Sequence, residues 1–274
     1  MRVSRRELLT IAAGFSLRPF AARAEMADGF QIVRARRILA PLLGPGSPEN
    51  EIWSFGEKSG PLVISARQGE ELKLRFVNEF EFELWLHWFG VRGSSDVMTF
   101  NVPAGSENSF DCVFTPPDAG TFWLGPMADA SRLRDMGLYG MLAVSEREPL
   151  AGIEDLPLVL DDWKLGEKGE IVKNFGDVET MVAEGRLGNW FTVNGQYRPR
   201  LALASGKYTR LRLLNAANVR TMGLLFKGGD PLLIARDGQP SKPRQLGGGS
   251  FALAPGERAD LLVLPEAQIT LALD

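Results

Sequence analysis

The chain of 274 residues has a single histidine, His87, and a single cysteine, Cys112. One imidazole excludes a polynuclear, histidine-ligated metal centre built by this chain alone, because such a centre needs several imidazole ligands. One thiol excludes an intramolecular disulfide. Cys112 alternates with Phe110 and Phe114 in a strand-like stretch, so we expect a buried thiol. A nucleophilic thiol would need a base beside it.

Long apolar runs are also lacking, and no later stretch approaches the roughly 18 apolar residues of a membrane span. At the N-terminus, Arg5 and Arg6 precede a short apolar stretch over residues 10–17 and a small-residue pattern at 22–24. This order is typical of a twin-arginine signal, which directs proteins that fold before translocation. We therefore expect residues 1–24 to be a signal peptide and the mature protein to be periplasmic, with no transmembrane segment.

Basic residues are outnumbered by acidic residues once this signal is removed. The chain has 31 basic and 34 acidic residues, and the signal carries five arginines and one glutamate, which leaves a formal charge of −7. A net negative charge disfavours binding to nucleic acid and to anionic membrane surfaces. We therefore expect no nucleic-acid partner.

Short strand-like runs separated by turn residues recur to the end of the chain and predict an all-β fold of sandwich or barrel type. The runs lie at residues 31–38, 62–66, 72–78, 84–88, 109–114, 120–124, 141–145, 156–160, 208–215, 222–226, 232–235, 250–253, 259–264 and 268–273.

Three segments lack this strand character. Residues 146–153 contain proline and glycine and indicate a linker, which predicts one domain over residues 25–147 and another over 148–274. Residues 166–188 are expected to hold at most one short helix, and residues 240–249 are expected to form a polar loop.

Several stretches are more specific than a β fold requires, and they follow one another in a fixed order. They are Leu-His-Trp-Phe-Gly at residues 86–90, Gly-Thr-Phe-Trp-Leu-Gly-Pro-Met at 120–127, Gly-Leu-Tyr-Gly-Met-Leu-Ala-Val at 137–144, Val-Asn-Gly at 193–195, Arg-Leu-Arg-Leu-Leu-Asn-Ala at 210–216 and Leu-Ala-Pro-Gly-Glu-Arg-Ala-Asp at 253–260. Over roughly residues 30–270 the chain resembles the multicopper oxidases, which are built from cupredoxin domains. The resemblance implies two cupredoxin-like Greek-key domains, with no counterpart of the family's third domain after Asp274.

The resemblance also implies that copper ligands have been replaced. In the family, the first-domain motifs supply four histidines to a trinuclear copper cluster, and the matching positions here hold His87, Phe89, Gly125 and Met127. Phe89 and Gly125 offer no donor atom, and a methionine thioether suits Cu(II) poorly. We therefore expect no copper cofactor and no catalytic residue. A weak Cu(I) site of His87, Met127 and a second methionine such as Met98 is the alternative at this position.

The residues around the replaced ligands are mostly large and apolar. They are Trp85, Trp88, Phe100, Trp123 and Met127, and we expect them to be core that fills the vacated position rather than the lining of a ligand pocket. Asp161 and Asp162 follow an apolar run, and we interpret this carboxylate pair as structural rather than metal-binding.

The copper ligands are lost while the other motifs of the family are retained. This combination predicts a non-catalytic, copper-free protein that binds an envelope protein or a second copy of itself. The family has a copper-free, twin-arginine-exported member in the cell envelope, which is a precedent for this interpretation. An alternative is one component of a laccase-type, copper-dependent oxidoreductase whose missing ligands come from another chain. A decaying remnant without selected function is the third possibility. The sequence thus favours a non-enzyme.

Overall fold

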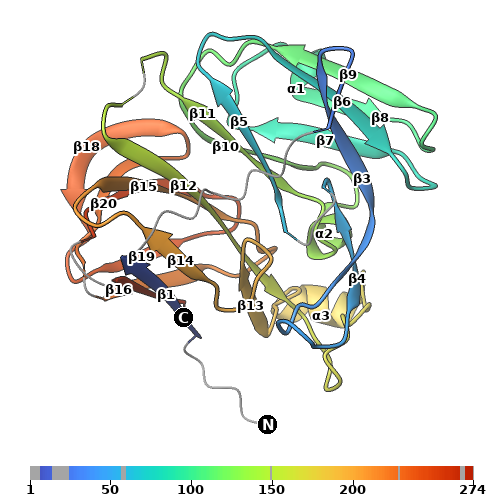
Figure 1. Ribbon diagram of the computed structural model, residues 1–274. Helices are drawn as coiled ribbons and strands as arrows, with labels where there is room; N and C mark the ends of the chain where they lie inside the picture. The colour runs from blue at the N-terminus through green and yellow to red at the C-terminus, as the bar shows by residue number, and fades with distance from the viewer. Residues whose placement is uncertain are drawn as a thin grey trace.

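The structure is a computed structural model (Figure 1) and describes residues 7–13, 25–56, 60–148, 150–227, 229–265 and 269–273. Strands dominate the described residues, which hold only three short helices, so the predicted all-β fold is confirmed. The strands form two halves, and Figure 1 shows the blue to green half beside the orange to red half.

Two sheets form the first half and enclose one apolar core, which includes Phe76, Leu86 and Trp88. One sheet has the strand order β5-β11-β10-β7-β8, and the other has the order β2-β3-β6-β9, with β4 paired to β3. The elements are β2 (Met26–Ala27), β3 (Phe30–Ala40), β4 (Asn50–Ser54), β5 (Leu62–Arg67), β6 (Leu72–Asn78), β7 (Leu84–Phe89), α1 (Ser95–Met98), β8 (Thr99–Val102), β9 (Ser109–Phe114), β10 (Gly120–Pro126), α2 (Ala130–Asp135) and β11 (Gly140–Ser145).

The second half also has two sheets, with a separate core that includes Leu158, Leu213 and Leu261. Their strand orders are β13-β12-β15-β20-β17-β18 and β14-β1-β21-β16-β19. The elements are β12 (Ile153–Trp163), α3 (Val178–Ala183), β13 (Trp190–Val193), β14 (Arg200–Leu203), β15 (Tyr208–Asn215), β16 (Met222–Lys227), β17 (Leu232–Arg236), β18 (Gln239–Gln245), β19 (Ser250–Leu253), β20 (Arg258–Val263) and β21 (Ile269–Leu273), joined by β1 (Glu7–Ala13).

Strand alternation places the only cysteine in the core, as predicted. Cys112 on β9 lies opposite Leu74 on β6, and both side chains are fully buried. The turn before β6 depends on Gly69, whose φ of +82° suits glycine. Burial raises the pKa of the Cys112 thiol to about 11, so the thiol stays protonated at neutral pH and is a poor nucleophile.

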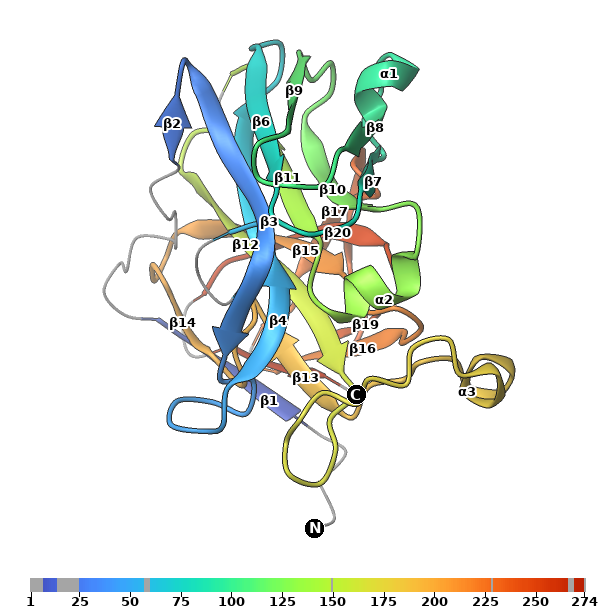
Figure 2. The same ribbon diagram turned by 90° about the vertical axis from the view of Figure 1, so that its right-hand side faces the viewer.

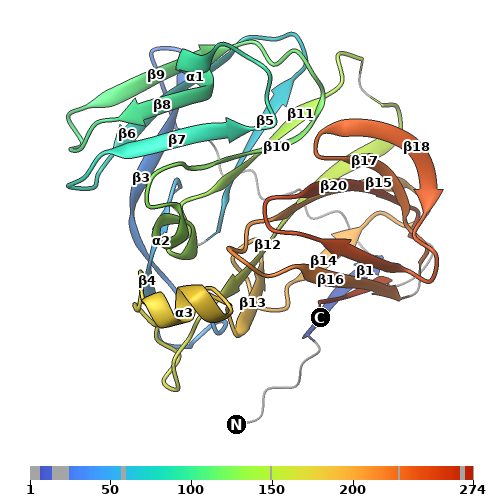
Figure 3. The same ribbon diagram turned by 180° about the vertical axis from the view of Figure 1, so that it is seen from behind.

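The polar loop expected over residues 240–249 is wrong in part. Gln239–Gln245 form β18, an exposed strand at the edge of its sheet, where β17 supplies the pairing. Its two prolines suit an edge, because proline cannot donate to a second neighbouring strand. The single short helix expected within residues 166–188 is confirmed as α3, which lies close to α2 in Figure 3.

The N-terminal segment enters the second half of the molecule. Residues 7–13 form β1 between β14 and β21 (Figure 1), whereas Arg5, Arg6 and the rest of the predicted signal lie outside the described residues. None of the helices in the described part of the chain has the length and apolar character needed to cross a membrane.

Candidate functional site

The four predicted copper-ligand positions lie on two paired strands, β7 and β10, or directly after β10. In the antiparallel pair β7 and β10, His87 lies opposite Gly125 and Phe89 lies opposite Trp123. The Met127 amide donates a hydrogen bond to the Trp85 carbonyl at 2.8 Å, which continues the pairing beyond β10. The structure thus brings these residues together, as the sequence pattern indicates.

His87 is held by neighbours within the protein. Its Nδ1 is 2.6 Å from the Thr99 hydroxyl on β8, and its ring meets Phe89 edge-on with 4.7 Å between centroids. Partial burial lowers the pKa of His87 below its ordinary value, so the ring is neutral at pH 7. His87 thus has a hydrogen-bond partner within the protein, the Thr99 hydroxyl.

Trp123 fills the space that a side chain at position 125 would need. A Cβ atom built on Gly125 would lie 2.3 Å from Trp123 Cζ3 and 3.0 Å from two further ring atoms. The indole also stacks on Phe89, with 4.2 Å between ring centroids and 12° between planes. Two of the three replaced ligand positions are therefore occupied by one aromatic stack, which leaves no room for an imidazole at residue 125 while Trp123 keeps this rotamer.

This packing makes Gly125 intolerant of even one methyl group. We expect Gly125→Ala to lower the free energy of unfolding by about 1–3 kcal/mol, because the new Cβ must displace the buried indole. Urea unfolding followed by tryptophan fluorescence measures this loss. Gly56→Ala is the matched control, because the nearest atom to a Cβ at Gly56 is 3.8 Å away. Equal stability of the two variants would contradict the fixed position of the indole.

The expectation that the surrounding large residues are core is correct for three of them and wrong for two. Trp88, Phe100 and Trp123 are buried. Trp85 is 41% exposed and Met127 is 53% exposed; Trp85 lies near the start of β7, and Met127 directly follows the end of β10. They form an exposed apolar pair, named here the Trp85–Met127 patch.

The two methionines of the alternative Cu(I) site differ in exposure, because Met127 is 53% exposed whereas Met98 is not. Met98 is buried, and its Sδ would lie 3.0 Å from a Cβ at Gly93. The described residues also contain no group of three or more histidine, cysteine, aspartate or glutamate side chains that could hold a metal ion.

Comparisons with known proteins show what the sequence and the fold resemble. Residues 43–149 match the sequence profile of the multicopper oxidases. A solved multicopper oxidase from Pseudomonas thermotolerans superposes with a TM-score of 0.77 at 34% identity, covering 85% of this chain and 57% of that protein. This chain is multicopper-oxidase-like. Its two β-sandwich halves are accordingly cupredoxin-like.

Curated relatives of this multicopper-oxidase-like chain include cell division protein FtsP. FtsP of Xenorhabdus nematophila is 28% identical over 232 residues, which are 80% of this chain and 47% of FtsP. FtsP of Escherichia coli K12 is 29% identical over 227 residues, which are 77% of this chain and 46% of FtsP. The chain thus spans about half the length of the curated relatives it matches.

A buried polar network at the junction of the two halves was not predicted. Arg212 on β15 is fully buried and donates to Thr121 Oγ1 at 3.1 Å and Val144 O at 3.2 Å in the first half. Within the second half its guanidinium contacts Asp155 at 2.9 Å and Asp260 at 3.4 Å. The network therefore ties the two cupredoxin-like halves together.

The carboxylate pair interpreted as structural lies at the same junction and has protein partners. The Tyr139 hydroxyl and Asp161 Oδ2 are 2.5 Å apart, and Arg220 binds Asp162 at 2.8 Å. Full burial raises the pKa of Asp161 to about 8, and the neighbouring Asp162 contributes further to this rise. Asp161 therefore remains largely protonated at neutral pH.

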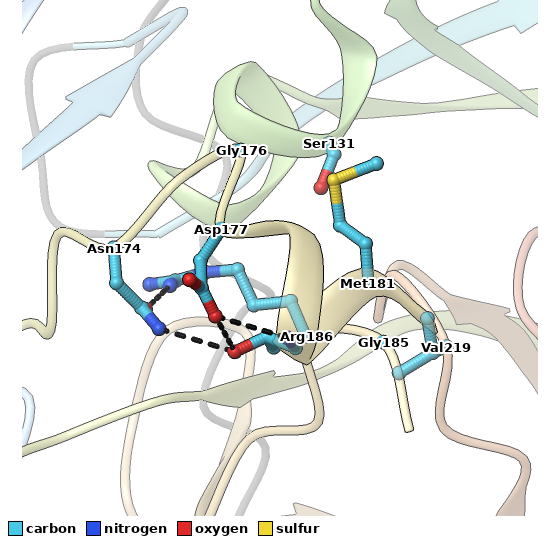
Figure 4. A pocket seen from close by; sticks show the side chains of 9 residues that line it. Ser131, Asn174, Gly176, Asp177, Met181, Gly185, Arg186 and Val219 are labelled. Carbon is cyan, nitrogen blue, oxygen red and sulfur yellow. Dashed lines mark hydrogen bonds between the residues drawn. The ribbon is translucent and has the colours of Figure 1, made fainter. Parts of the chain in front are cut away.

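A small cavity of about 210 Å³ lies between α2, α3 and the loop at Val219 (Figure 4). Its inner wall is Arg186, which donates to Asn174 Oδ1 at 2.6 Å and forms an ion pair with Asp135. Met181 on α3 lines the cavity and is also exposed to solvent. The guanidinium is thus already bound by protein partners, and Asp177 is the other charged residue of the lining.

Proposed function

We propose that this chain is a copper-free, non-catalytic protein exported to the periplasm by the twin-arginine pathway, where it binds a protein of the cell envelope and serves cell division. Similarity to FtsP over about 80% of the chain supports the cell-division role. The position of Arg5 and Arg6 in front of the apolar stretch supports the export route.

The observation that carries the proposal is the aromatic stack at the replaced ligand positions. Phe89 and Trp123 are apolar rings in contact, and the indole covers Gly125. A copper cluster requires nitrogen or sulfur donors aimed at a common point, whereas this arrangement places carbon there. The residues present do not fit a trinuclear centre, so oxygen reduction has no site among them.

The Trp85–Met127 patch is the surface that we assign to the envelope partner. Exposed tryptophan and methionine side chains are enriched at protein interfaces, where a few such residues carry most of the binding energy. The Trp85 indole is oriented by a hydrogen bond to Glu83 Oε1 at 3.1 Å. A rigid aromatic ring flanked by a flexible thioether suits an apolar groove or helix of a partner protein.

Metal content is the first test of the copper-free state. The exported protein is reconstituted anaerobically with Cu(I), exposed to air and analysed by mass spectrometry and visible spectroscopy. We expect no stoichiometric copper, no blue colour and no oxidase activity. Stoichiometric copper would overturn the proposal and favour the alternative oxidoreductase with ligands from another chain.

Complementation of a cell-division defect is the second test, because it measures whether the partner surface is needed. A strain of the source organism that lacks the gene is complemented with the wild-type chain or with Trp85→Ala/Met127→Ala, and cell length is measured by microscopy. We expect the double variant to fold normally and to fail in complementation. Val113→Ala is the matched control, because Val113 is an exposed apolar residue on β9, away from the patch. Full complementation by the double variant would contradict this surface.

A further inference from the structure

The strand β1 occupies an internal position in a sheet that later residues build. Its residues 7–11 pair antiparallel with β21, from Glu7 opposite Leu273 to Ile11 opposite Ile269. Its residues 10–13 pair in parallel with β14, from Thr10 opposite Arg200 to Ala13 opposite Leu203. In Figures 1 and 2, β1 lies alongside β14 in this half of the molecule.

Without β1, this sheet would have a gap. Among the described strands, β14 pairs with β1 alone, and β21 has only β16 on its other side. Withdrawal of β1 would separate β14 from the sheet and turn β21 into an edge with unpaired backbone groups. Such an edge is a template for another extended segment. The gap between β14 and β21 can therefore accept a strand that runs parallel to β14 and antiparallel to β21.

The segment that fills the gap has a second expected role. It directly follows Arg5 and Arg6 and includes the start of the apolar stretch of the predicted export signal. Its sequence, Glu-Leu-Leu-Thr-Ile-Ala-Ala, is apolar at five of seven positions and contains the β-branched residues Thr10 and Ile11, which suit a strand. A backbone segment hydrogen-bonded on both sides within a sheet cannot at the same time be bound by an export receptor.

We propose that the gap between β14 and β21 is an acceptor site for the chain's own export signal, so that the folded second half and the export receptor compete for residues 7–13. The inference rests on the twin-arginine route of the proposed function. In the folded precursor the signal is sheltered as β1. Recognition requires its withdrawal, and removal of the signal then leaves the acceptor site open in the exported protein.

Engineered disulfides in the full-length chain test the strand position. Cys112 is the only native cysteine, so Cys112→Ala gives a clean background. Leu9→Cys/Leu271→Cys joins residues that lie directly opposite each other, and Leu8→Cys/Ala272→Cys is the adjacent pair. Neighbouring antiparallel pairs alternate between hydrogen-bonded and non-hydrogen-bonded geometry, so one of the two has the shorter Cβ separation.

The control pair, Leu9→Cys/Leu224→Cys, places the second thiol on β16, which lies beyond β21. We expect the better registered pair to cross-link at least about tenfold faster than this control under mild oxidation, because only the registered thiols come within disulfide range. We further expect the cross-linked precursor to lose binding to membrane vesicles that carry the twin-arginine receptor, and a reductant to restore it. Equal cross-linking rates, or receptor binding by the cross-linked precursor, would overturn the proposal.

Hydrogen exchange is measured on the unsubstituted full-length chain, so its result does not depend on whether the cysteine variants fold. We expect amides of β1 and β14 to be protected together with those of β16. Free exchange in β1 and β14 beside a protected β16 would also overturn the proposal. Arg5→Lys/Arg6→Lys tests the export route separately: continued export of this variant would refute that route, whereas the cross-linking and exchange results concern only the strand.

Discussion

Replacing Arg212 with alanine is expected to lower the free energy of unfolding by about 3–5 kcal/mol, because the substitution leaves the buried carboxylate of Asp260 without its ion-pair partner, whereas Asp155 keeps its ion pair with Arg210. Arg212 is fully buried and contacts Asp155 and Asp260. It also donates to Thr121 Oγ1 and Val144 O, so the two halves lose a shared tie. Urea unfolding followed by both far-UV circular dichroism and tryptophan fluorescence measures the loss.

Arg92→Ala is the control for the loss of a cation as such. Arg92 pairs with Asp118 at 2.6 Å, but its side chain is 72% exposed, so we expect a change below about 1 kcal/mol. The double substitution Arg212→Met/Asp260→Leu removes both buried charges and should recover part of the stability lost in Arg212→Ala. If Arg212→Ala were no less stable than Arg92→Ala, the network would not hold the halves together.

The strands that sequence reasoning placed correctly are those with strong local patterns. The predicted bounds of β6, β9, β15 and β19 agree with the structure, because each has an apolar run or alternation bounded by turn residues. The strands β4 and β8 were missed because they span only five and four residues, too few for an alternation to stand out in the sequence. β18 was missed because its place in the sheet depends on β17 rather than on its own polar sequence.

The site could be predicted as a set of positions but not as a packed surface. Motif order placed His87, Phe89, Gly125 and Met127 together, and the β7–β10 pairing does bring them close. The position of the Trp123 ring over Gly125 is a rotamer choice, which residue types alone do not determine. For the same reason the sequence did not separate the exposed Met127 from the buried aromatic residues.

The polar network at the junction escaped prediction because its members are distant in sequence. Arg210 and Arg212 alternate on β15 with buried leucines, which by itself suggests a solvated face. The parallel pairing with β12 places Asp155 opposite Arg210, and the antiparallel pairing with β20 places Asp260 opposite Arg212. Strand order, which the sequence did not provide, converts these separate charges into a buried ion-pair network.

The buried carboxyl of Asp161 is expected to make stability fall as pH rises, and Asp161→Asn should remove that dependence. Burial raises the pKa of Asp161 from 3.8 to about 8, so in this range the folded state holds a proton that the unfolded state releases. Stability from this group is complete below pH 4 and is lost toward pH 8. Between pH 5 and 7 the wild type should lose about 2–3 kcal/mol relative to Asp161→Asn.

Asparagine is a suitable replacement because its amide imitates the neutral acid. Its oxygen can accept from the Asp162 amide, and its NH₂ group can donate to the Tyr139 hydroxyl oxygen. Asp118→Asn is the control: the Arg92 guanidinium lowers the pKa of Asp118, so this carboxylate is charged at both pH values in both states. Its effect on the unfolding free energy should be the same at pH 5 and pH 7. Free energies of unfolding are obtained from urea unfolding at each pH. If these free energies changed equally with pH in the wild type and in Asp161→Asn, Asp161 would ionise normally and the junction would be open to water.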